Sequence, residues 1–224
     1  MNYFPSVETF NMNSVDGRAL YLAHCDLDPI RALIIHTRIA LNATIEYFGD
    51  EAQKAGSSGD LYAESNAMDI QSVFASQVAS LNYEAVLLIL VSRLEEALNT
   101  WCRCVHLKNS DSPELKDYSP DRGYGALEKA ANYLKAYAGG YSIKSDRAWE
   151  TITAIRDTRN IIIHNGGRVK AELRPKLEKH RIEMREEDHS VYMDYDTLMW
   201  AYEEILQFCD RVYNIRGQAF PEKQ

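Results

Sequence analysis

The segment LNYEAVLLILVSRLEEALNTWCRCV, residues 81–105, decides the fold class of this chain. Its apolar residues recur every three to four positions, as they do on the buried faces of an α-helix. The same pattern extends over about residues 68–108 and forms two apolar stripes. One comprises Phe74, Val78, Leu81, Ala85 and Leu88, and the other comprises Leu87, Val91, Leu94, Leu98, Trp101 and Val105. Two stripes predict burial on more than one side, as in the central helix of a bundle.

Further helices are predicted on both sides of this segment. Asp28-Pro29 suits the N-cap and first position of a helix, and glycines after two later segments suit helix ends. The expected helices cover about residues 27–55, 123–138, 146–164 and 196–215. The helical pattern fails between residues 172 and 191, where a small β-hairpin is predicted instead. The expected fold is therefore all-α, a bundle of four or five helices with a small β-hairpin insert.

The chain length and the hydropathy pattern indicate how the protein is organised into domains. A chain of 224 residues, 46% of them hydrophobic, suits one domain with an appendage. We expect residues 1–67 to form an N-terminal arm and a helix packed on the core, with a loosely docked arm up to about residue 26, and residues 68–217 to form the helical domain. No stretch approaches the ~20 apolar residues needed to cross a bilayer, and no signal peptide is recognisable. A cytoplasmic protein without a membrane anchor is expected.

The charge distribution is uneven along the chain. The net charge of −8 argues against broad, sequence-blind binding to long nucleic acids. Between residues 168 and 181, however, six basic residues minus two acidic ones give a local charge of +4. This segment predicts either a basic surface or a solvated charged loop. The four cysteines form no CxxC pair and no zinc pattern, so reduced, buried thiols and neither metal nor cofactor are expected.

The helix predicted over residues 146–164 places a cation on its apolar face. Trp149, Ile152, Ile155, Ile162 and Ile163 form that face. Arg159 lies about 40° from Ile155 on the helical wheel. An arginine there is costly unless it is paired or its head group reaches a cleft.

The end of this helix is apolar on most sides. Ile161, Ile162 and Ile163 together cover about 200° of the wheel. That predicts a second packing partner, for which a twofold-related copy of the same helix is the economical choice. Beside this surface, Arg156, Asn160 and His164 follow at i, i+4 and i+8 as a polar stripe.

His164 stands in the last turn of this helix. The negative end of the helix dipole favours a protonated ring, which suits a general acid. Simple capping of the helix end by a cation is the alternative, and it requires no catalysis.

The spacing of Arg159 and His164 carries little information alone, because Arg31 and His36 have the same spacing. The context is more specific. The segment Arg156-Asp157-Thr158-Arg159-Asn160-Ile161-Ile162-Ile163-His164-Asn165-Gly166-Gly167 resembles the signature of the HEPN superfamily, in which an arginine and a polar residue precede three further residues and a histidine. Residues 92–99 and 124–130 resemble the preceding helices of such domains. The resemblance covers about residues 68–215.

This resemblance implies a bundle that dimerises through the signature helices, so that two Arg/His sets face one cleft. Many such proteins are metal-independent endoribonucleases of toxin–antitoxin and other defence systems. In that chemistry the RNA 2′-OH attacks the adjacent phosphate. His164 would be the general acid or base, Arg159 would stabilise the transition state, and Asn160 would orient the phosphate or His164. Glu95 would pair with Arg159, and Arg156 would be a secondary phosphate contact.

Two other interpretations stay open. Some members of the superfamily have lost catalysis and serve as dimerisation modules or bind a nucleotide or a partner protein. The other alternative is an unrelated helical protein with a well-capped helix. A toxin branch of the superfamily carries a tyrosine, modified by its antitoxin, where this chain has Gly166. That regulation is therefore not expected here, and whether a neutralising partner protein exists stays open.

Overall fold

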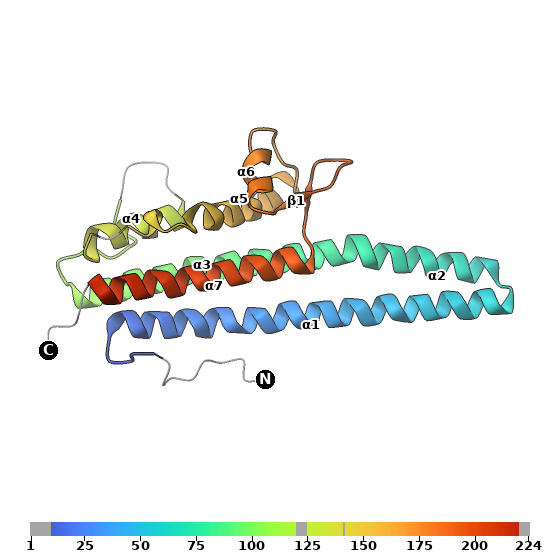
Figure 1. Ribbon diagram of the computed structural model, residues 1–224, viewed down its shortest axis with the longest axis horizontal. Helices are drawn as coiled ribbons and strands as arrows, with labels where there is room; N and C mark the ends of the chain where they lie inside the picture. Colours follow the sequence, from blue (N-terminus) through green and yellow to red (C-terminus); the bar gives the residue numbers. More distant parts are fainter. Residues whose placement is uncertain (1–9, 120–124, 141, 220–224) are drawn as a thin grey trace. The chain divides into compact units, whose positions relative to one another are not determined.

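The computed structural model describes residues 10–119, 125–140 and 142–219, and this part of the chain is mainly helical, as predicted. Long helices dominate, and one pair of short strands interrupts them (Figure 1). The elements are α1 (Val15–Ser58), α2 (Leu61–Val73), the π-helix η2 (Phe74–Val78), α3 (Ala79–Lys108), α4 (Ala126–Tyr137), the 3-10 helix η3 (Ile143–Ser145), α5 (Trp149–Asn165), α6 (Arg174–Lys179), β1 (Glu183–Met184), β2 (Val191–Tyr192) and α7 (Tyr195–Ala219). The strands pair antiparallel, with Glu183 opposite Tyr192, which confirms the predicted β-hairpin.

Helices α1 and α6 differ from the predictions. Helix α1 does not begin at Asp28-Pro29 but at Val15, and it continues through Pro29. A proline inside a helix costs about 3 kcal/mol, and the buried side chains of Leu20, Leu27 and Ile30 on both sides of it offset that cost. Residues 15–26, expected to belong to a loose arm, are therefore helical, and residues 1–9 lie outside the described part. The short helix α6 also lies within residues 172–191, where no helix was expected.

The chain folds into two compact units, each assembled from segments that are far apart in the sequence. Unit 1 comprises Met1–Ile30, Ile89–Asp157 and Trp200–Gln224, and unit 2 comprises Arg31–Leu88 and Thr158–Met199. Each unit draws on both sides of residues 67 and 68. The boundary predicted at residues 67 and 68 separates two domains, whereas these two units describe how the chain packs. The domain boundary therefore stays a prediction.

Unit 1 holds the larger apolar core. The second apolar stripe of α3 is buried as predicted, together with side chains of α4, α5 and α7. The largest fully buried side chains in this unit are Leu27, Leu90, Leu94, Leu98, Trp101, Leu127, Tyr133, Leu134, Ile143 and Phe208. The first part of α1 packs antiparallel to α7: the Tyr202 hydroxyl donates to Asp28 at 3.2 Å, and His24 Nε2 lies 2.9 Å from Asp210 Oδ1.

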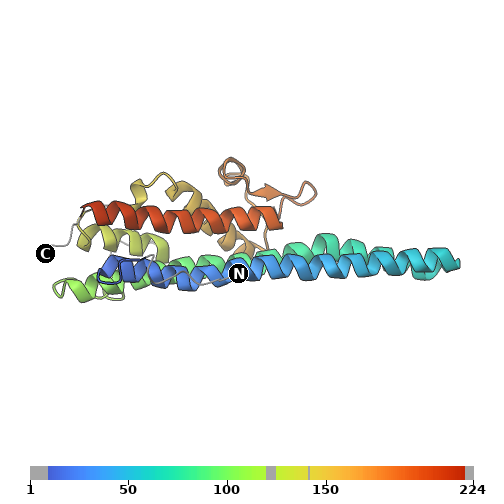
Figure 2. The same ribbon diagram turned by 60° about the horizontal axis from the view of Figure 1, so that its bottom comes forward.

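Unit 2 contains a helical hairpin made by residues 31–58 of α1 and by α2, which run side by side in both views (Figures 1 and 2). Gly59 makes the turn with a φ of 79°. Asp60 then caps α2 by accepting a hydrogen bond from the Ala63 N–H at 3.0 Å. Further along the hairpin, Gln71 Nε2 donates to the Ile45 carbonyl at 3.2 Å. These contacts fix the register of the two helices.

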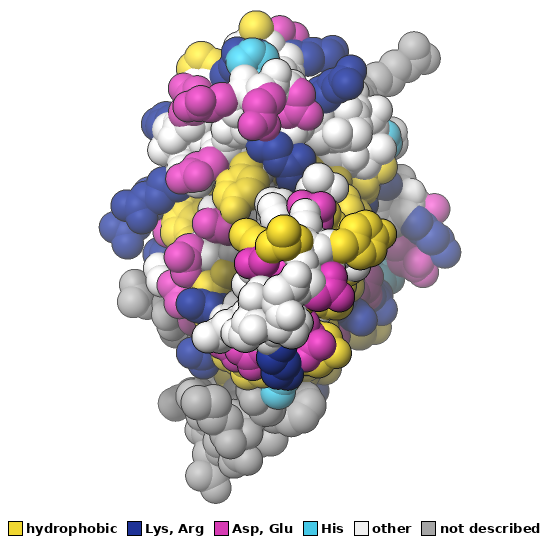
Figure 3. All heavy atoms as spheres, turned by 90° about the vertical axis from the view of Figure 1, so that its right-hand side faces the viewer, with side chains coloured by type: hydrophobic (Ala, Val, Ile, Leu, Met, Phe, Trp, Pro, Cys, Tyr) yellow, Lys and Arg dark blue, Asp and Glu magenta, His cyan; other side chains and the backbone are white. Residues whose placement is uncertain are grey.

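The first apolar stripe is not buried as predicted. Leu81 is 63% exposed in the structure, and Ala85 is exposed as well. Figure 3 shows hydrophobic side chains among acidic ones on the face where the α1–α2 turn lies, and Leu61 and Tyr62 at that turn are exposed. Unit 2 therefore leaves apolar helix surface uncovered.

One continuous helical run in the described part, residues 61–108, is long and apolar enough to cross a membrane by length and composition alone. Only 28% of its most apolar window is buried. The same run supplies Leu94, Leu98 and Trp101 to the core of unit 1. Core helices of soluble proteins pass this test too, so the run is weak support for a membrane span.

Candidate functional site

Helix α5 carries the candidate site, and both of its ends are defined by local hydrogen bonds. It begins at Trp149, later than predicted, because the turn η3 precedes it and Asp146 Oδ1 accepts from the Ala148 N–H at 2.8 Å. At its other end, Gly166 and Gly167 adopt φ values of 57° and 81°. The Gly167 N–H donates to the Ile161 carbonyl at 3.2 Å. The glycine pair therefore ends the helix, as predicted.

The chain that leaves α5 is tied to the β-hairpin within unit 2. The Val191 N–H donates to the Gly167 carbonyl at 2.9 Å, and the Val169 N–H donates to the His189 carbonyl at 3.1 Å. Arg168 and Ser190 form an isolated antiparallel bridge. The hairpin thus fixes the direction of the basic segment directly after His164.

Arg159 and Asn160 lie together and are half-buried. Arg159 Nη1 donates to Asn160 Oδ1 at 3.0 Å. Arg159 Nε is buried and has no hydrogen-bond partner among the described residues. A buried N–H of a guanidinium without an acceptor is costly. Arg159 therefore retains a donor that an incoming anion could satisfy.

His164 is exposed in the last turn of α5. Within residues 10–119, 125–140 and 142–219, its ring makes neither a hydrogen bond nor an ion pair, so both ring nitrogens are open to a ligand. The adjacent isoleucines differ in burial: Ile161 is 4% exposed, whereas Ile163 is 44% exposed. The apolar surface expected beside His164 is thus present and uncovered.

Arg156 is held by two carboxylates. Its Nη1 pairs with Glu128 of α4, and its Nη2 lies 2.7 Å from Asp157 Oδ1. Burial lowers the pKa of Arg156, but the hydrogen bonds and charges of Glu128 and Asp157 outweigh burial and raise it. Because one cation faces two carboxylates, a phosphate would have to displace one of them. Arg156 therefore joins α4 to α5, and its predicted phosphate contact stays a prediction.

Glu95, the predicted partner of Arg159, is half-buried on α3 and belongs to unit 1. Arg159 belongs to unit 2. Their pairing stays a prediction. Glu128, by contrast, was not singled out from the sequence, although it lies within the stretch 124–130 that resembles helices of HEPN domains. Its pairing with Arg156 spans 28 positions, and no local pattern encodes such a contact.

The basic segment keeps exposed cations. Arg168, Lys170 and Arg181 are exposed, and none of them has an ion-pair partner in the part of the chain that the structure describes. The β-hairpin that follows is acidic, with Glu183, Glu186, Glu187 and Asp188 against Arg185. The positive charge therefore lies in the segment beside the end of α5 and does not extend into the hairpin.

The described residues contain no group of three or more His, Cys, Asp or Glu side chains placed to hold a metal ion. The four cysteines, all within the described residues, form no disulfide. Cys102 and Cys209 are buried, and burial raises the pKa of Cys209 to about 12. Neither buried thiol is suited to nucleophilic chemistry.

Comparisons with protein-family models, with curated proteins and with solved structures find no match to this chain. The function is therefore inferred from the residues of α5 and their surroundings.

Proposed function

We propose that this protein is a metal-independent endoribonuclease that acts as a homodimer in the cytoplasm, in a defence or toxin-type system. One observation carries the proposal. A half-buried Arg159–Asn160 pair lies in the last turns of a helix whose final turn carries the exposed His164. Among the described residues, neither Arg159 Nε–H nor the His164 ring has a hydrogen-bond partner. An anion-binding donor and a proton-transfer group thus come from one short, glycine-terminated segment.

The proposed reaction is an internal transesterification. The 2′-oxygen of the RNA attacks the adjacent phosphorus, and the bond from phosphorus to the 5′-oxygen breaks. The proton of the 2′-OH passes to a base, and an acid delivers a proton to the leaving 5′-oxygen, which gives a 2′,3′-cyclic phosphate and a 5′-hydroxyl. His164 serves in proton transfer, which contributes about 10²–10⁴-fold to a rate. The free donors of Arg159 stabilise the charge on the phosphoryl oxygens.

The homodimer supplies two such sets to one cleft. Ile163 supports this part of the proposal, because it is exposed directly beside His164. Burying one isoleucine side chain stabilises by about 1.5–3 kcal/mol, and a twofold axis would bury two copies of it. The exposed cations Arg168 and Lys170 would then bind the RNA backbone. If the protein is a toxin, a neutralising partner protein would have to cover this end of α5.

The second candidate function is a catalytically inactive module that dimerises or binds a nucleotide or a partner protein. Two observations favour it. The net charge is −8, and Arg156, one turn before Asn160, is already neutralised by Glu128 and Asp157. An inactive module would still dimerise, and it would show no RNA cleavage that depends on His164.

The test compares wild-type protein with the variants His164→Ala and His36→Ala on mixed single-stranded and structured RNA in EDTA. His36 is the matched control, because it is exposed and follows Arg31 at the same spacing. We expect His164→Ala to lower the rate at least about 100-fold and His36→Ala to leave it unchanged. If the two variants cut RNA at equal rates, the ribonuclease proposal is wrong. If no protein cuts RNA while all remain dimers, the inactive module replaces it.

The dimer is tested separately by light scattering after gel filtration. We expect Ile163→Glu to give monomers, whereas Leu107→Glu, at a leucine 83% exposed on α3, leaves the dimer intact. A wild-type monomer at micromolar concentration would contradict the shared cleft.

A further inference from the structure

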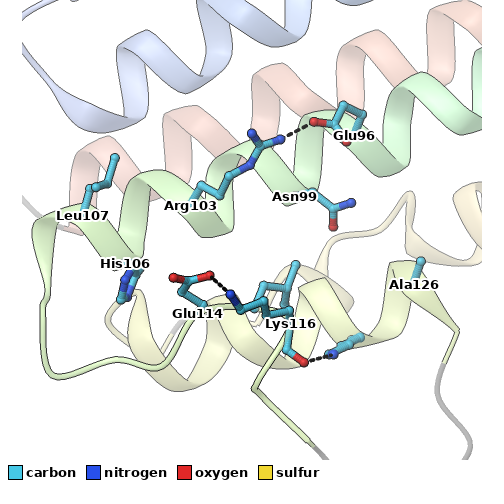
Figure 4. A pocket seen from close by; sticks show the side chains of 10 residues that line it. Glu96, Asn99, Arg103, His106, Leu107, Glu114, Lys116 and Ala126 are labelled. Carbon is cyan, nitrogen blue, oxygen red and sulfur yellow. Dashed lines mark hydrogen bonds and ion pairs between the residues drawn. The ribbon is translucent and has the colours of Figure 1, made fainter.

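A second candidate site lies entirely within unit 1, and none of its lining residues belongs to the set proposed for RNA cleavage. It is a pocket of about 630 Å³, a size typical of small-molecule sites. One face of the last turns of α3 forms one wall, residues 114–116 form another, and the first turns of α4 close it (Figure 4). The lining residues are Glu96, Asn99, Arg103, His106, Leu107, Glu114, Leu115, Lys116, Ala126 and Lys129.

The wall made by the segment after α3 is anchored to buried side chains. Ser112 is 2% exposed, and Tyr133 of α4 is fully buried. The Tyr133 hydroxyl donates to the Pro113 carbonyl at 2.8 Å, and its oxygen also lies 3.2 Å from Ser112 Oγ. Burial raises the pKa of Tyr133, so its hydroxyl stays a donor. The pocket is therefore formed before any ligand arrives.

The same anchored segment orients His106. His106 Nδ1 lies 2.8 Å from the Ser112 carbonyl. A carbonyl only accepts hydrogen bonds, so Nδ1 carries the proton in the neutral ring as well as in the charged one. That leaves Nε2 without a partner among the described residues and available to a ligand.

The polar groups of the pocket carry an excess of positive charge. Three cations and two carboxylates line it, which gives +1 with a neutral histidine, in a protein of charge −8. Figure 4 shows Arg103 directed at Glu96 and Lys116 directed at Glu114. Lys129 has no carboxylate partner in the described chain. Its Nζ donates only to the Lys116 carbonyl, at 3.2 Å, so Lys129 is the uncompensated charge.

We propose that this pocket binds a small organic anion, a carboxylate or a phosphate monoester joined to an apolar body. Lys129 Nζ contacts the anionic group, because Lys129 is half-buried, has donors to spare and has no carboxylate partner among the described residues. Leu107, which is 83% exposed, and Leu115 contact the apolar body. His106 Nε2 provides a third, polar contact. The proposal does not rest on the ribonuclease, because no residue of α5 lines this pocket.

The test is calorimetric titration of the full-length protein with phenyl phosphate, with benzoate and with inorganic phosphate. Lys129→Gln removes the charge, and Lys129→Arg keeps it. Lys135→Gln is the matched control, because Lys135 is exposed on the same helix but does not line the pocket. We expect phenyl phosphate or benzoate to bind in a ratio of one to one and inorganic phosphate to bind more weakly. Lys129→Gln should weaken binding about tenfold, with no change in Lys129→Arg or Lys135→Gln.

The relative affinities of phenyl phosphate and benzoate show whether the pocket prefers a phosphate or a carboxylate headgroup. Two results would overturn the proposal: no heat of binding from either aromatic anion at millimolar concentration, or equal affinities for wild type and Lys129→Gln. If Lys129→Gln does not fold, Lys116→Gln replaces it. Lys116 supplies its backbone carbonyl to the pocket wall but exposes its side chain, so we expect about threefold weaker binding from the lost charge, and no change would again overturn the proposal.

Discussion

Replacing Glu128 by glutamine is expected to destabilise unit 1 by about 2 kcal/mol. The side chains of Arg156, Glu128 and Asp157 are 17%, 20% and 21% exposed, so water screens their interactions weakly. Removing one partner of a buried ion pair costs about 3–5 kcal/mol. The expected cost of Glu128→Gln is below that range, because Asp157 keeps its contacts with Arg156 Nε and Nη2 at 3.1 and 2.7 Å.

Arg156→Met should destabilise the protein more, by about 3 kcal/mol, because Glu128 and Asp157 both lose the cation that they contact. The double variant should cost less than the sum of the two single variants, with a coupling energy of about 1–2 kcal/mol. Urea unfolding followed by far-ultraviolet circular dichroism near neutral pH measures all three changes. If the free-energy costs of the two single variants add up to that of the double variant, with a coupling energy below about 0.5 kcal/mol, Arg156 is not a structural cation that joins α4 to α5.

Three further predictions concern other parts of the chain. Burial lowers the pKa of His24, but its hydrogen bond and charge interaction with Asp210, followed by those with Asp28, raise the pKa overall. The stabilisation from these contacts is fully present below the ordinary histidine pKa of about 6.5, and it is lost as the pH rises through the higher pKa of the folded state. Urea unfolding should therefore find His24→Gln destabilising by about 0.5–1 kcal/mol at acidic pH and neutral at alkaline pH. Gly167→Ala should lower stability by about 1–2 kcal/mol in thermal unfolding, because alanine is strained at a φ of 81°; an unchanged melting temperature would count against the observed end of α5. Iodoacetamide should label Cys209 only after denaturation, since its thiol is buried and its pKa is raised to about 12; rapid labelling of the native protein, identified by mass spectrometry, would contradict that burial.

Short-range sequence signals predicted most of the helices. The glycines at positions 139–140 and 166–167 end α4 and α5 where expected, because glycine adopts positive φ without strain. The second stripe of α3 is buried as its 3.6-residue period indicated. The strands β1 and β2 also lie where the helical pattern fails. These features depend on neighbours within one or two helical turns, which a sequence displays directly.

The errors arise where tertiary packing decides. Pro29 suggested a helix start, but the buried faces of α1 on both sides of it favour one continuous helix. Leu81 has the spacing of a core residue and is 63% exposed, since periodicity reports an apolar face without naming what covers it. The Arg156–Glu128 pair joins two helices, and no local spacing encodes it.

The candidate site was foreseeable in part. Sequence context singled out Arg159, Asn160 and His164, and the structure adds the hydrogen bond from Arg159 to Asn160 and the unsatisfied Nε–H. The pocket around His106 and Lys129 was missed, because its residues come from two helices and the segment between them, and none of them forms a motif in the chain.

The decisive test of ribonuclease activity follows one short single-stranded RNA and its 2′-O-methyl counterpart, each incubated in EDTA with wild-type protein and with His164→Ala. Mass spectrometry identifies the ends of the products. We expect that only the wild type cuts, that it cuts only the unmodified RNA, and that the products carry 2′,3′-cyclic phosphates and 5′-hydroxyls. Cleavage of the methylated strand, or equal cleavage by His164→Ala, would contradict this expectation.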